Sequence, residues 1–321
     1  MSEILWTGKI AEITKFATGE SPSKIIPLGQ GATSAAWRVD TGPNAVVVRI
    51  IPAGTPRPIT YQSEFTVLRL LEAKDCPVPS PILNSAARPN QLTHIQEPWA
   101  VTKAIEGQAI KKSQLSKTTA KNLGELLAAL HSLPVTQFGR LAEQTGGVVG
   151  LQNDAISGVC ARWCWAPIWP FDDCHLEQHT LSNLDAHIAA QLKDLKPTIF
   201  KAATEDRAVL VHSDLHGEHI FEKDEKLTGV IDFGASFIGA PAWDFAVIAY
   251  YHGWAALEAL LTGYTSSGKV QSYQLKQAQK LGVAVSLYKL AKGLKGRPTP
   301  KKLNKITDFL NQTMQAIEKI G

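Results

Sequence analysis

The stretch Val211–Phe221, VHSDLHGEHIF, says more about the fold than any other part of the chain. A run of apolar residues ends here in a polar loop. The loop carries His212, Asp214, His216 and His219. Such a density of imidazoles and carboxylates is typical of two sites, a hydrolytic zinc centre and the catalytic loop of a phosphotransferase. The rest of the chain distinguishes them.

A second acidic loop follows in FEKDEKLTGVIDFGA. This segment predicts a hairpin whose second strand, LTGVID, ends at Asp232 and is followed by Phe233 and Gly234. We therefore expect Asp214 and Asp232 on two loops at the mouth of one small sheet. That arrangement suits a general base and a metal-binding carboxylate that face one substrate.

The N-terminal third predicts an antiparallel sheet with helices. Apolar residues in 1–16 have helical spacing, KIIPLG, AAWRVD and AVVVRII predict strands, and TGPN between the last two predicts a hairpin turn. The segment YQSEFTVLRLLEA predicts a helix on this sheet, and 92–105 supplies further strand. The sequence from 107 onward predicts mainly helices.

Two features of the N-terminal third suggest phosphate binding. In LGQGATSAAWRV, Gly29 and Gly31 lie between two strands, where backbone N–H groups can approach phosphate oxygens, although a hairpin turn alone also explains them. Arg49 ends the apolar strand and Glu64 follows fifteen positions later on the predicted helix. This pair suits a phosphate-binding cation and its orienting carboxylate, or else a strand-end charge and a solvated helix residue.

Strands before helices predict an α+β protein of two lobes. We expect an N-terminal nucleotide-binding lobe at 1–104 and a C-terminal catalytic and substrate-binding lobe at 105–321, with a helical insertion at about 135–205. The 321 residues have a formal net charge of +4, no run of ~18 apolar residues and four cysteines. These features favour a cytoplasmic protein, a monomer or dimer, without a nucleic-acid or membrane partner.

In order and spacing, these pieces resemble the aminoglycoside phosphotransferase family, antibiotic kinases with a protein-kinase-like fold. The resemblance rests on LGQGATS, AVVVR, Glu64, ALHSLP, HSDLHGEH, IDFG and GAPAWDFA, which span about 28–247. It implies that Asp214 is the catalytic aspartate and that His212 braces its loop. It also implies that Asp244, in GAPAWDFA, is a structural aspartate that steadies the loop.

The resemblance also implies a nucleotide site with Mg²⁺ and ATP, or GTP. Asp232 matches the magnesium-binding aspartate, while Arg49 and Glu64 match the phosphate-binding cation and its partner. The implied nucleotide contacts are Gly29, Gly31, Thr33, Ser34, Arg49, Glu64, Glu97, Trp99 and Val101, the last three through the adenine-binding hinge.

Two positions depart from the family pattern. His219 stands where the family usually has Asn; imidazole binds divalent metals, although magnesium prefers oxygen, and the macrolide and viomycin kinases are similar at this position. Arg49 replaces the protein-kinase lysine and brings a different, forked geometry. We keep His219 and Asp232 as the metal ligands and interpret His216 as a solvent-facing loop residue.

The substrate is the least specified part. The insertion contains ARWCWAPIWPFDDCH, from which we take Trp163, Trp165, Trp169, Asp172 and Asp173 as candidate substrate contacts, with packing of the aromatic residues as the alternative. The expected substrate is a small molecule with a free hydroxyl, first an aminoglycoside, macrolide or peptide antibiotic. An endogenous metabolite such as choline, homoserine or a sugar-like compound stays open, as does a non-catalytic pseudokinase. A zinc hydrolase would leave Gly29, Gly31, Arg49 and Glu64 without a role.

Overall fold

The computed structural model describes the chain in ten segments. These are residues 3–31, 33–55, 60–87, 90–110, 115–144, 146–163, 186–265, 267–268, 271–295 and 299–318. The chain divides into two units, each with its own sheet. The first unit comprises Met1–Gln108, Glu143–Gly147 and Thr228–Gly234, and the second comprises Ala109–Ala142, Val148–Leu227 and Ala235–Gly321. The chain thus first leaves the first unit after Gln108, and two later segments return to it.

The first unit is built on a five-stranded sheet with the order β1-β2-β3-β5-β4. Its strands are β1 (Lys24–Gln30), β2 (Ala35–Thr41), β3 (Asn44–Ile50), β4 (Pro81–Asn84) and β5 (Trp99–Lys103). All neighbours are antiparallel, and the predicted hairpin closes with Thr41 opposite Asn44. Gly42 in that turn has a φ of 65°, which glycine adopts without strain.

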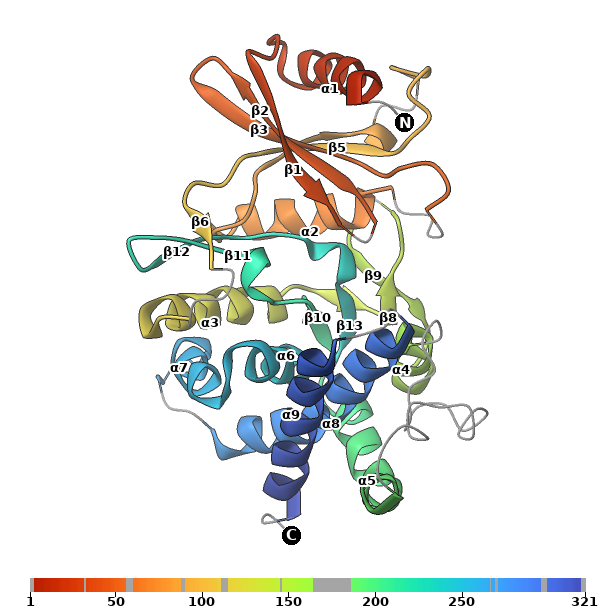
Figure 1. Ribbon diagram of the computed structural model, residues 1–321, viewed down its shortest axis with the longest axis vertical. Helices are drawn as coiled ribbons and strands as arrows, with labels where there is room; N and C mark the ends of the chain where they lie inside the picture. The colour runs from red at the N-terminus through yellow and green to blue at the C-terminus, as the bar shows by residue number, and fades with distance from the viewer. Residues whose placement is uncertain are drawn as a thin grey trace. The chain divides into compact units, whose positions relative to one another are not determined.

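Two helices pack on this sheet, α1 (Glu3–Thr18) and α2 (Gln62–Glu72). In Figure 1, α1 lies above the strands and α2 below them. Helix α1 buries Ile10 and Ile13 against a cluster of strand residues, namely Val39, Val46, Val48, Ile50, Trp99 and Val101. Helix α2 buries Phe65, Val67, Leu68 and Leu71 at the helical spacing seen in the sequence.

The N-terminus of α2 is capped from a distant part of the chain. Tyr61 precedes the helix with a φ of 63° and provides no side-chain cap. Instead, the Glu143 carboxylate accepts hydrogen bonds from the backbone N–H groups of Gln62 and Ser63 at 3.0 and 3.3 Å and from the Ser63 hydroxyl at 2.7 Å. This cap explains why a segment around residue 143 belongs to the first unit.

The second unit has a five-stranded sheet with the order β10-β13-β8-β9-β7. Its strands are β7 (Val135–Thr136), β8 (Phe138–Leu141), β9 (Val148–Gln152), β10 (Val209–Val211) and β13 (Phe237–Gly239). A further sheet has the order β12-β11-β6 and contains β6 (Gln108–Ala109) and the predicted hairpin of β11 (Ile220–Lys223) and β12 (Lys226–Val230). Short 3₁₀ turns occur at Ser85–Ala87, Gly217–His219 and Phe233–Ala235.

The insertion expected to be helical at about 135–205 begins as three strands. Helix α4 (Ala155–Trp163) follows them, and α5 (Ala186–Thr204) comes later. Gln137 and Gly139 have φ values of 62° and 77°, which interrupt any helix there. The valines of β7 and β9 favour strands, so the prediction was wrong for the first part of this segment.

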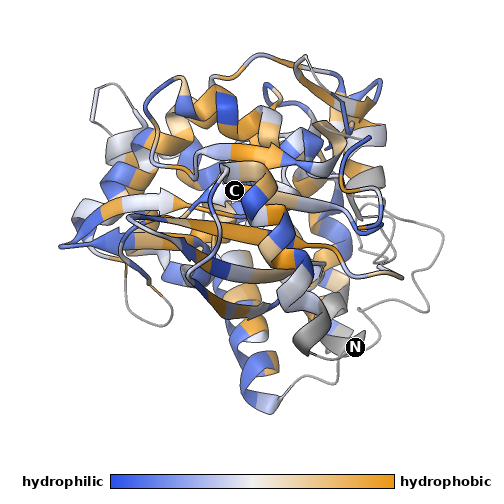
Figure 2. Cartoon of the chain, turned by 90° about the horizontal axis from the view of Figure 1, so that it is seen from above, coloured by the Kyte–Doolittle hydropathy of each residue, from blue (hydrophilic) through white to orange (hydrophobic). Residues whose placement is uncertain are grey.

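Helices dominate the rest of the second unit. They are α3 (Lys117–His131), α6 (Ala242–His252), α7 (Trp254–Tyr264), α8 (Ser272–Lys295) and α9 (Pro300–Glu318). Glycines allow α3 and α7 to cross closely: a Cβ at Gly124 would collide with the Leu260 carbonyl, and one at Gly263 with the Lys121 carbonyl. Figure 2 shows that many of the helices carry both hydrophobic and hydrophilic residues. In the ten described segments, no helix has the length and apolar character needed to cross a membrane.

Candidate active site

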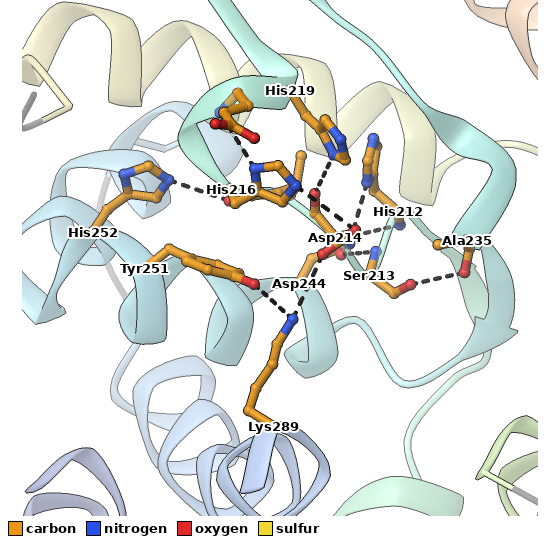
Figure 3. Close-up of polar contacts among 12 residues, drawn as sticks. His212, Ser213, Asp214, His216, His219, Ala235, Asp244, Tyr251, His252 and Lys289 are labelled. Carbon is orange, nitrogen blue, oxygen red and sulfur yellow. Dashed lines mark hydrogen bonds and ion pairs between the residues drawn. The ribbon is translucent and has the colours of Figure 1, made fainter. Parts of the chain in front are cut away.

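A buried carboxylate on α6 holds the loop that follows β10. Oδ2 of Asp244 accepts a hydrogen bond from the backbone N–H of His212 at 2.9 Å, and Oδ1 accepts one from the backbone N–H of Ser213 at 2.7 Å (Figure 3). Asp244 and His212 are fully buried. Ser213 has a φ of 69°, and its hydroxyl donates to the Ala235 carbonyl at 2.7 Å. The loop is therefore fixed at its backbone immediately before Asp214.

Asp244 is in turn held by a second buried histidine. Nε2 of His131, at the end of α3, lies 3.1 Å from Oδ2 of Asp244, and its Nδ1 lies 3.0 Å from the hydroxyl of Tyr264 on α7. A buried carboxylate needs such compensation to offset its lost hydration. His131 lies within the ALHSLP motif, but the sequence reasoning gave it no role. The motif's position at a helix end was the available signal.

Asp214 is half-buried and lies beside a lysine from a remote helix. Nζ of Lys289, on α8, lies 3.6 Å from Oδ1 of Asp214 and donates to the hydroxyl of Tyr251 at 2.7 Å. Nδ1 of His212 accepts from the Asp214 backbone N–H at 3.3 Å. Burial alone would raise the pKa of Asp214, but the Lys289 ammonium and the neighbouring histidines hold it below its usual range. The Asp214 carboxylate is thus ionised at neutral pH.

The two loop histidines have different tautomers. Nδ1 of His219 lies 2.8 Å from the Asp214 carbonyl oxygen, which can only accept, so Nδ1 carries a proton. Nδ1 of His216 accepts from the Glu218 backbone N–H at 3.3 Å, so Nε2 carries its proton. With Nδ1 protonated, Nε2 is the atom through which His219 can bind a metal ion.

His216, expected to face solvent, is 23% exposed and packs against its neighbours in the loop. Its ring centroid lies 3.7 Å from that of His219 and 5.6 Å from that of Tyr251, and Nε2 lies 3.9 Å from Oδ2 of Asp214. Asp214, His216 and His219 offer possible metal-ligand atoms within 4.8 Å of one another. The Lys289 ammonium and the His216 tautomer both disfavour a zinc ion bound by all three groups.

In the first unit, Arg49 and Glu64 form a buried ion pair. Nη2 of Arg49 lies 2.8 Å from Oε1 of Glu64, and their side chains are 15% and 5% exposed. The alternative of two unrelated surface charges is therefore wrong. The Tyr61 ring also contacts Arg49, with the guanidinium carbon 4.9 Å from the ring centroid. Burial alone would lower the pKa of Arg49, but Glu64, Tyr61 and Asp232 together raise it, so the guanidinium stays charged.

Asp232 lies beside this pair. It follows β12 with a φ of 66°, and its charge acts on both Arg49 and Glu64. A Cβ built at Gly234 would lie 3.3 Å from Oδ1 of Asp232 and 3.9 Å from Oε2 of Glu64, so glycine keeps this space open. One guanidinium and two carboxylates in the same place can bind phosphate oxygens and their counter-cation.

The expected glycine turn is present between β1 and β2. Gly29 has a φ of 131° at an irregularity in the strand register, and the Gly31 backbone N–H donates to the Ser34 carbonyl at 2.8 Å. Thr33 and Ser34 lie in the same turn and are partly buried. Glycine is required at position 29 because other residues rarely adopt this φ.

The expected hinge residues are differently placed. Both carboxylate oxygens of Glu97 accept from Nζ of Lys9 at 2.7 Å, and the side chains of Trp99 and Val101 are buried in the sheet core. β5 pairs with β3 on one side and β4 on the other, so its backbone groups are used in the sheet. This register leaves few free backbone groups at Trp99 and Val101, so nucleotide contacts at these residues stay a prediction.

The expected substrate contacts fall mostly outside the described residues. This applies to Trp165, Trp169, Asp172 and Asp173. Trp163 is the last residue of α4, and the structure describes its backbone alone.

Comparison with known families identifies the chain's family. The model of the APH phosphotransferase enzyme family matches residues 24–273, which is most of the chain. The chain belongs to this family. A search of curated proteins found no match. The α+β protein-kinase-like fold predicted from the sequence is confirmed, and membership in the APH family makes the protein a small-molecule phosphotransferase.

Solved structures of APH-type enzymes are similar over nearly the whole chain. The GDP complex of aminoglycoside 2'-phosphotransferase-IIIa has a TM-score of 0.67 and 16% identity, covering 98% of this chain and 99% of that one. A thermostable mutant of aminoglycoside phosphotransferase APH(4)-Ia has a TM-score of 0.67 and 15% identity, covering 95% and 98%. The macrolide 2'-phosphotransferase MphH from Brachybacterium faecium has a TM-score of 0.59 and 15% identity, covering 94% and 98%. At these identities the similarity establishes the fold.

Proposed function

We propose that this APH-family protein transfers the γ-phosphoryl group of ATP or GTP to a hydroxyl of a small molecule, with Asp214 as the base. The observation that carries the proposal is the fixed loop: Asp244 binds the two backbone N–H groups immediately before Asp214. A general base must be held within hydrogen-bond reach of the proton it accepts. The two hydrogen bonds to Asp244 supply that constraint, and Lys289 and the loop histidines keep the Asp214 carboxylate ionised.

The transfer follows from this base. A hydroxyl oxygen of the acceptor bonds to the γ-phosphorus while the bond from phosphorus to the β-bridging oxygen breaks. The hydroxyl proton passes to the Asp214 carboxylate, and the nucleoside diphosphate leaves. Most of the rate enhancement in such reactions comes from positioning and charge stabilisation, which explains why the loop is so firmly held.

The nucleotide site draws on the first unit. Arg49, fixed by Glu64 and Tyr61, supplies a permanent cation for the phosphates, and Gly29, with its positive φ, lets the backbone between β1 and β2 approach them. The structures of related fold support this assignment, because they include an AMP-PNP and hygromycin B ternary complex of APH(4)-Ia and a GDP complex of the 2'-phosphotransferase.

Asp232 and His219 are the residues that would hold Mg²⁺. Their chemistry fits the ion in part: Asp232 provides the oxygen that magnesium prefers, and His219 offers Nε2 as a nitrogen ligand. A bound magnesium ion would offset the charge of the nucleotide phosphates. His219 keeps this position because its Nδ1–H donates a hydrogen bond to the backbone carbonyl oxygen of Asp214.

The acceptor class we propose first is an antibiotic hydroxyl, whose phosphorylation would give resistance. The names of the similar structures, aminoglycoside and macrolide phosphotransferases, support it. Kinases of endogenous metabolites share the same chemistry and form the second candidate. A pseudokinase is disfavoured because Asp214, Asp232 and the buried Arg49–Glu64 pair are all present.

The test is a transfer assay with magnesium ATP or GTP and a mixed panel of macrolides, aminoglycosides, peptide antibiotics and amino alcohols, with products detected by mass. A phosphorylated product that disappears in Asp214→Asn supports the proposal. Product formation by Asp214→Asn at the wild-type rate contradicts the assignment of the base.

A further inference from the structure

Three helices of the second unit place two lysines around one tyrosine next to Asp214. Nζ of Lys289 on α8 lies 4.8 Å from the ring centroid of Tyr251 on α6. Nζ of Lys305 on α9 lies 5.5 Å from the same centroid and 5.0 Å from that of Tyr250. We call Lys289, Lys305, Tyr250 and Tyr251 the lysine–tyrosine cluster. Figure 3 shows its Lys289 and Tyr251 beside the catalytic loop.

Any acceptor must approach this cluster. A hydroxyl that gives its proton to Asp214 has to lie about 3 Å from the carboxylate. Because Nζ of Lys289 is 3.6 Å from Oδ1 of Asp214, the atoms that flank the reacting hydroxyl lie within a few ångströms of an ammonium group. Lys289 is itself 12% exposed and is fixed by its bond to the Tyr251 hydroxyl, so it keeps this place.

Lys305 adds a cation without a matching carboxylate. Among the side chains that the structure describes, no acidic group forms an ion pair with Lys305, whereas Lys289 is paired with Asp214. Lys305 is exposed to solvent; its ammonium lies over the tyrosine rings, where partial desolvation and repulsion by Lys289 lower its pKa. A cation in this position gains from a bound anion.

The other titratable groups near the cluster do not cancel the positive charge of Lys305. Burial lowers the pKa of His252, so its imidazole is neutral at neutral pH. Burial raises the pKa of Tyr250 and of Tyr251, so their hydroxyls stay protonated. The Glu218 carboxylate acts on Tyr251 and His216, but it is exposed to solvent, where its field is screened.

We infer that the acceptor carries an oxyanion, a carboxylate or a phosphate, which binds Lys305 on the acceptor side of the catalytic loop while a hydroxyl of the same molecule reaches Asp214. The inference rests on the proposed function and narrows it. A polycationic aminoglycoside would bring ammonium groups toward Lys289 and Lys305, which is unfavourable. An anionic hydroxy compound gains charge-assisted hydrogen bonds there, and the partly exposed Tyr251 provides apolar surface for its carbon skeleton.

Matched acceptors that differ in charge test the inference. The first set is gluconate, glucose phosphate, glucose and glucosamine; the second is glycerate, glycerol phosphate, glycerol and aminopropanediol. Binding to the full chain with magnesium AMP-PNP is measured by calorimetry for the wild type, Lys305→Gln and the control Lys302→Gln. Lys302 is an exposed lysine on the same helix, so its substitution removes the same charge outside the cluster.

The inference predicts that an anionic member of at least one set binds about tenfold more tightly than its neutral and cationic partners. Lys305→Gln should weaken this binding about tenfold, and Lys302→Gln should leave it unchanged. The carboxylate and phosphate members decide which oxyanion is preferred. Equal or tighter binding of the neutral or cationic members, no effect of Lys305→Gln, or no binding of any anionic member at millimolar concentration overturns the inference.

Product formation separates this inference from the proposed function. The same compounds are incubated with magnesium ATP, together with the antibiotic panel, and analysed by mass. Asp214-dependent phosphorylation of cationic acceptors alone overturns the inference and keeps the kinase function. Phosphorylation of an anionic acceptor supports both. Binding of anionic compounds without any product in either panel supports the oxyanion site and counts against the kinase function.

Discussion

Asp244 and Ser213 are joined by a 2.7 Å hydrogen bond between a fully buried carboxylate and a backbone N–H group, immediately before the proposed base. The carboxylate also accepts a hydrogen bond from the N–H of His212. Asparagine at position 244 would remove the negative charge, and its NH2 group would face one of the two backbone N–H donors. We predict that Asp244→Asn lowers the free energy of unfolding by about 2–4 kcal/mol, measured in urea.

The matched control for this change is Asp194→Asn, at an exposed position on α5. It should change the free energy of unfolding by less than about 0.5 kcal/mol. Equal stability of Asp244→Asn and Asp194→Asn would show that the hydrogen bonds of Asp244 do not hold the loop.

Arg49→Lys tests why arginine occupies the phosphate-binding position. Lysine keeps the charge but loses the planar contact with Tyr61 and the geometry that places Nη2 2.8 Å from Oε1 of Glu64. We expect nucleotide affinity to fall about tenfold, measured with a fluorescent ATP analogue. Arg38→Lys, at a side chain that is 42% exposed, is the control and should bind nucleotide normally. Unchanged affinity in Arg49→Lys would mean that charge alone is needed.

Lys289→Met should change the pH dependence of transfer. Burial raises the pKa of Asp214, and Lys289 is the largest of the groups that lower it below its usual range. In the wild type, the base stays ionised as the pH falls, and activity is lost only below that depressed pKa. Without Lys289 the pKa of Asp214 rises, so the acidic limb of the rate profile moves to higher pH. A limb that stays in place or moves to lower pH contradicts the role given to Lys289.

His219→Asn should alter the metal preference of the reaction. Imidazole suits manganese and cobalt better than magnesium, whereas an amide oxygen suits magnesium. We predict that the ratio of the rate with magnesium to the rate with manganese rises in His219→Asn and is unchanged in His94→Asn, a substitution at an exposed histidine of the first unit. An unchanged ratio in His219→Asn would remove His219 from the metal site.

The site residues that lie in short motifs could be predicted from the sequence. Asp244 in GAPAWDFA and Glu64 on its helix have the places that the family resemblance implied, since the spacing of a strand, a turn or a helix is local. The family resemblance implied a nucleotide contact at Glu97, which stays a prediction; the Glu97 side chain binds Lys9, which lies 88 positions earlier in the chain. The packing of α1 decides that partner, and no local pattern reports it.

In the second unit, too, contacts that depend on packing could not be predicted from the sequence. Lys289 lies in α8, far from the VHSDLHGEHIF stretch, and only the packing of α8 on α6 brings it to Asp214. The strands at the start of the insertion depend on Gln137 and Gly139 adopting left-handed φ values, which composition does not reveal. Motifs therefore predict the base, whereas tertiary contacts determine the charge around it.

The most direct measurement is phosphoryl transfer by the wild type and by Asp214→Asn, with nucleotide binding measured on both. Asp214→Asn keeps the shape of the side chain and removes the base. We expect transfer to fall at least about a hundredfold while nucleotide affinity stays within about threefold of the wild type. Transfer by Asp214→Asn at the wild-type rate would contradict the central claim that Asp214 accepts the hydroxyl proton.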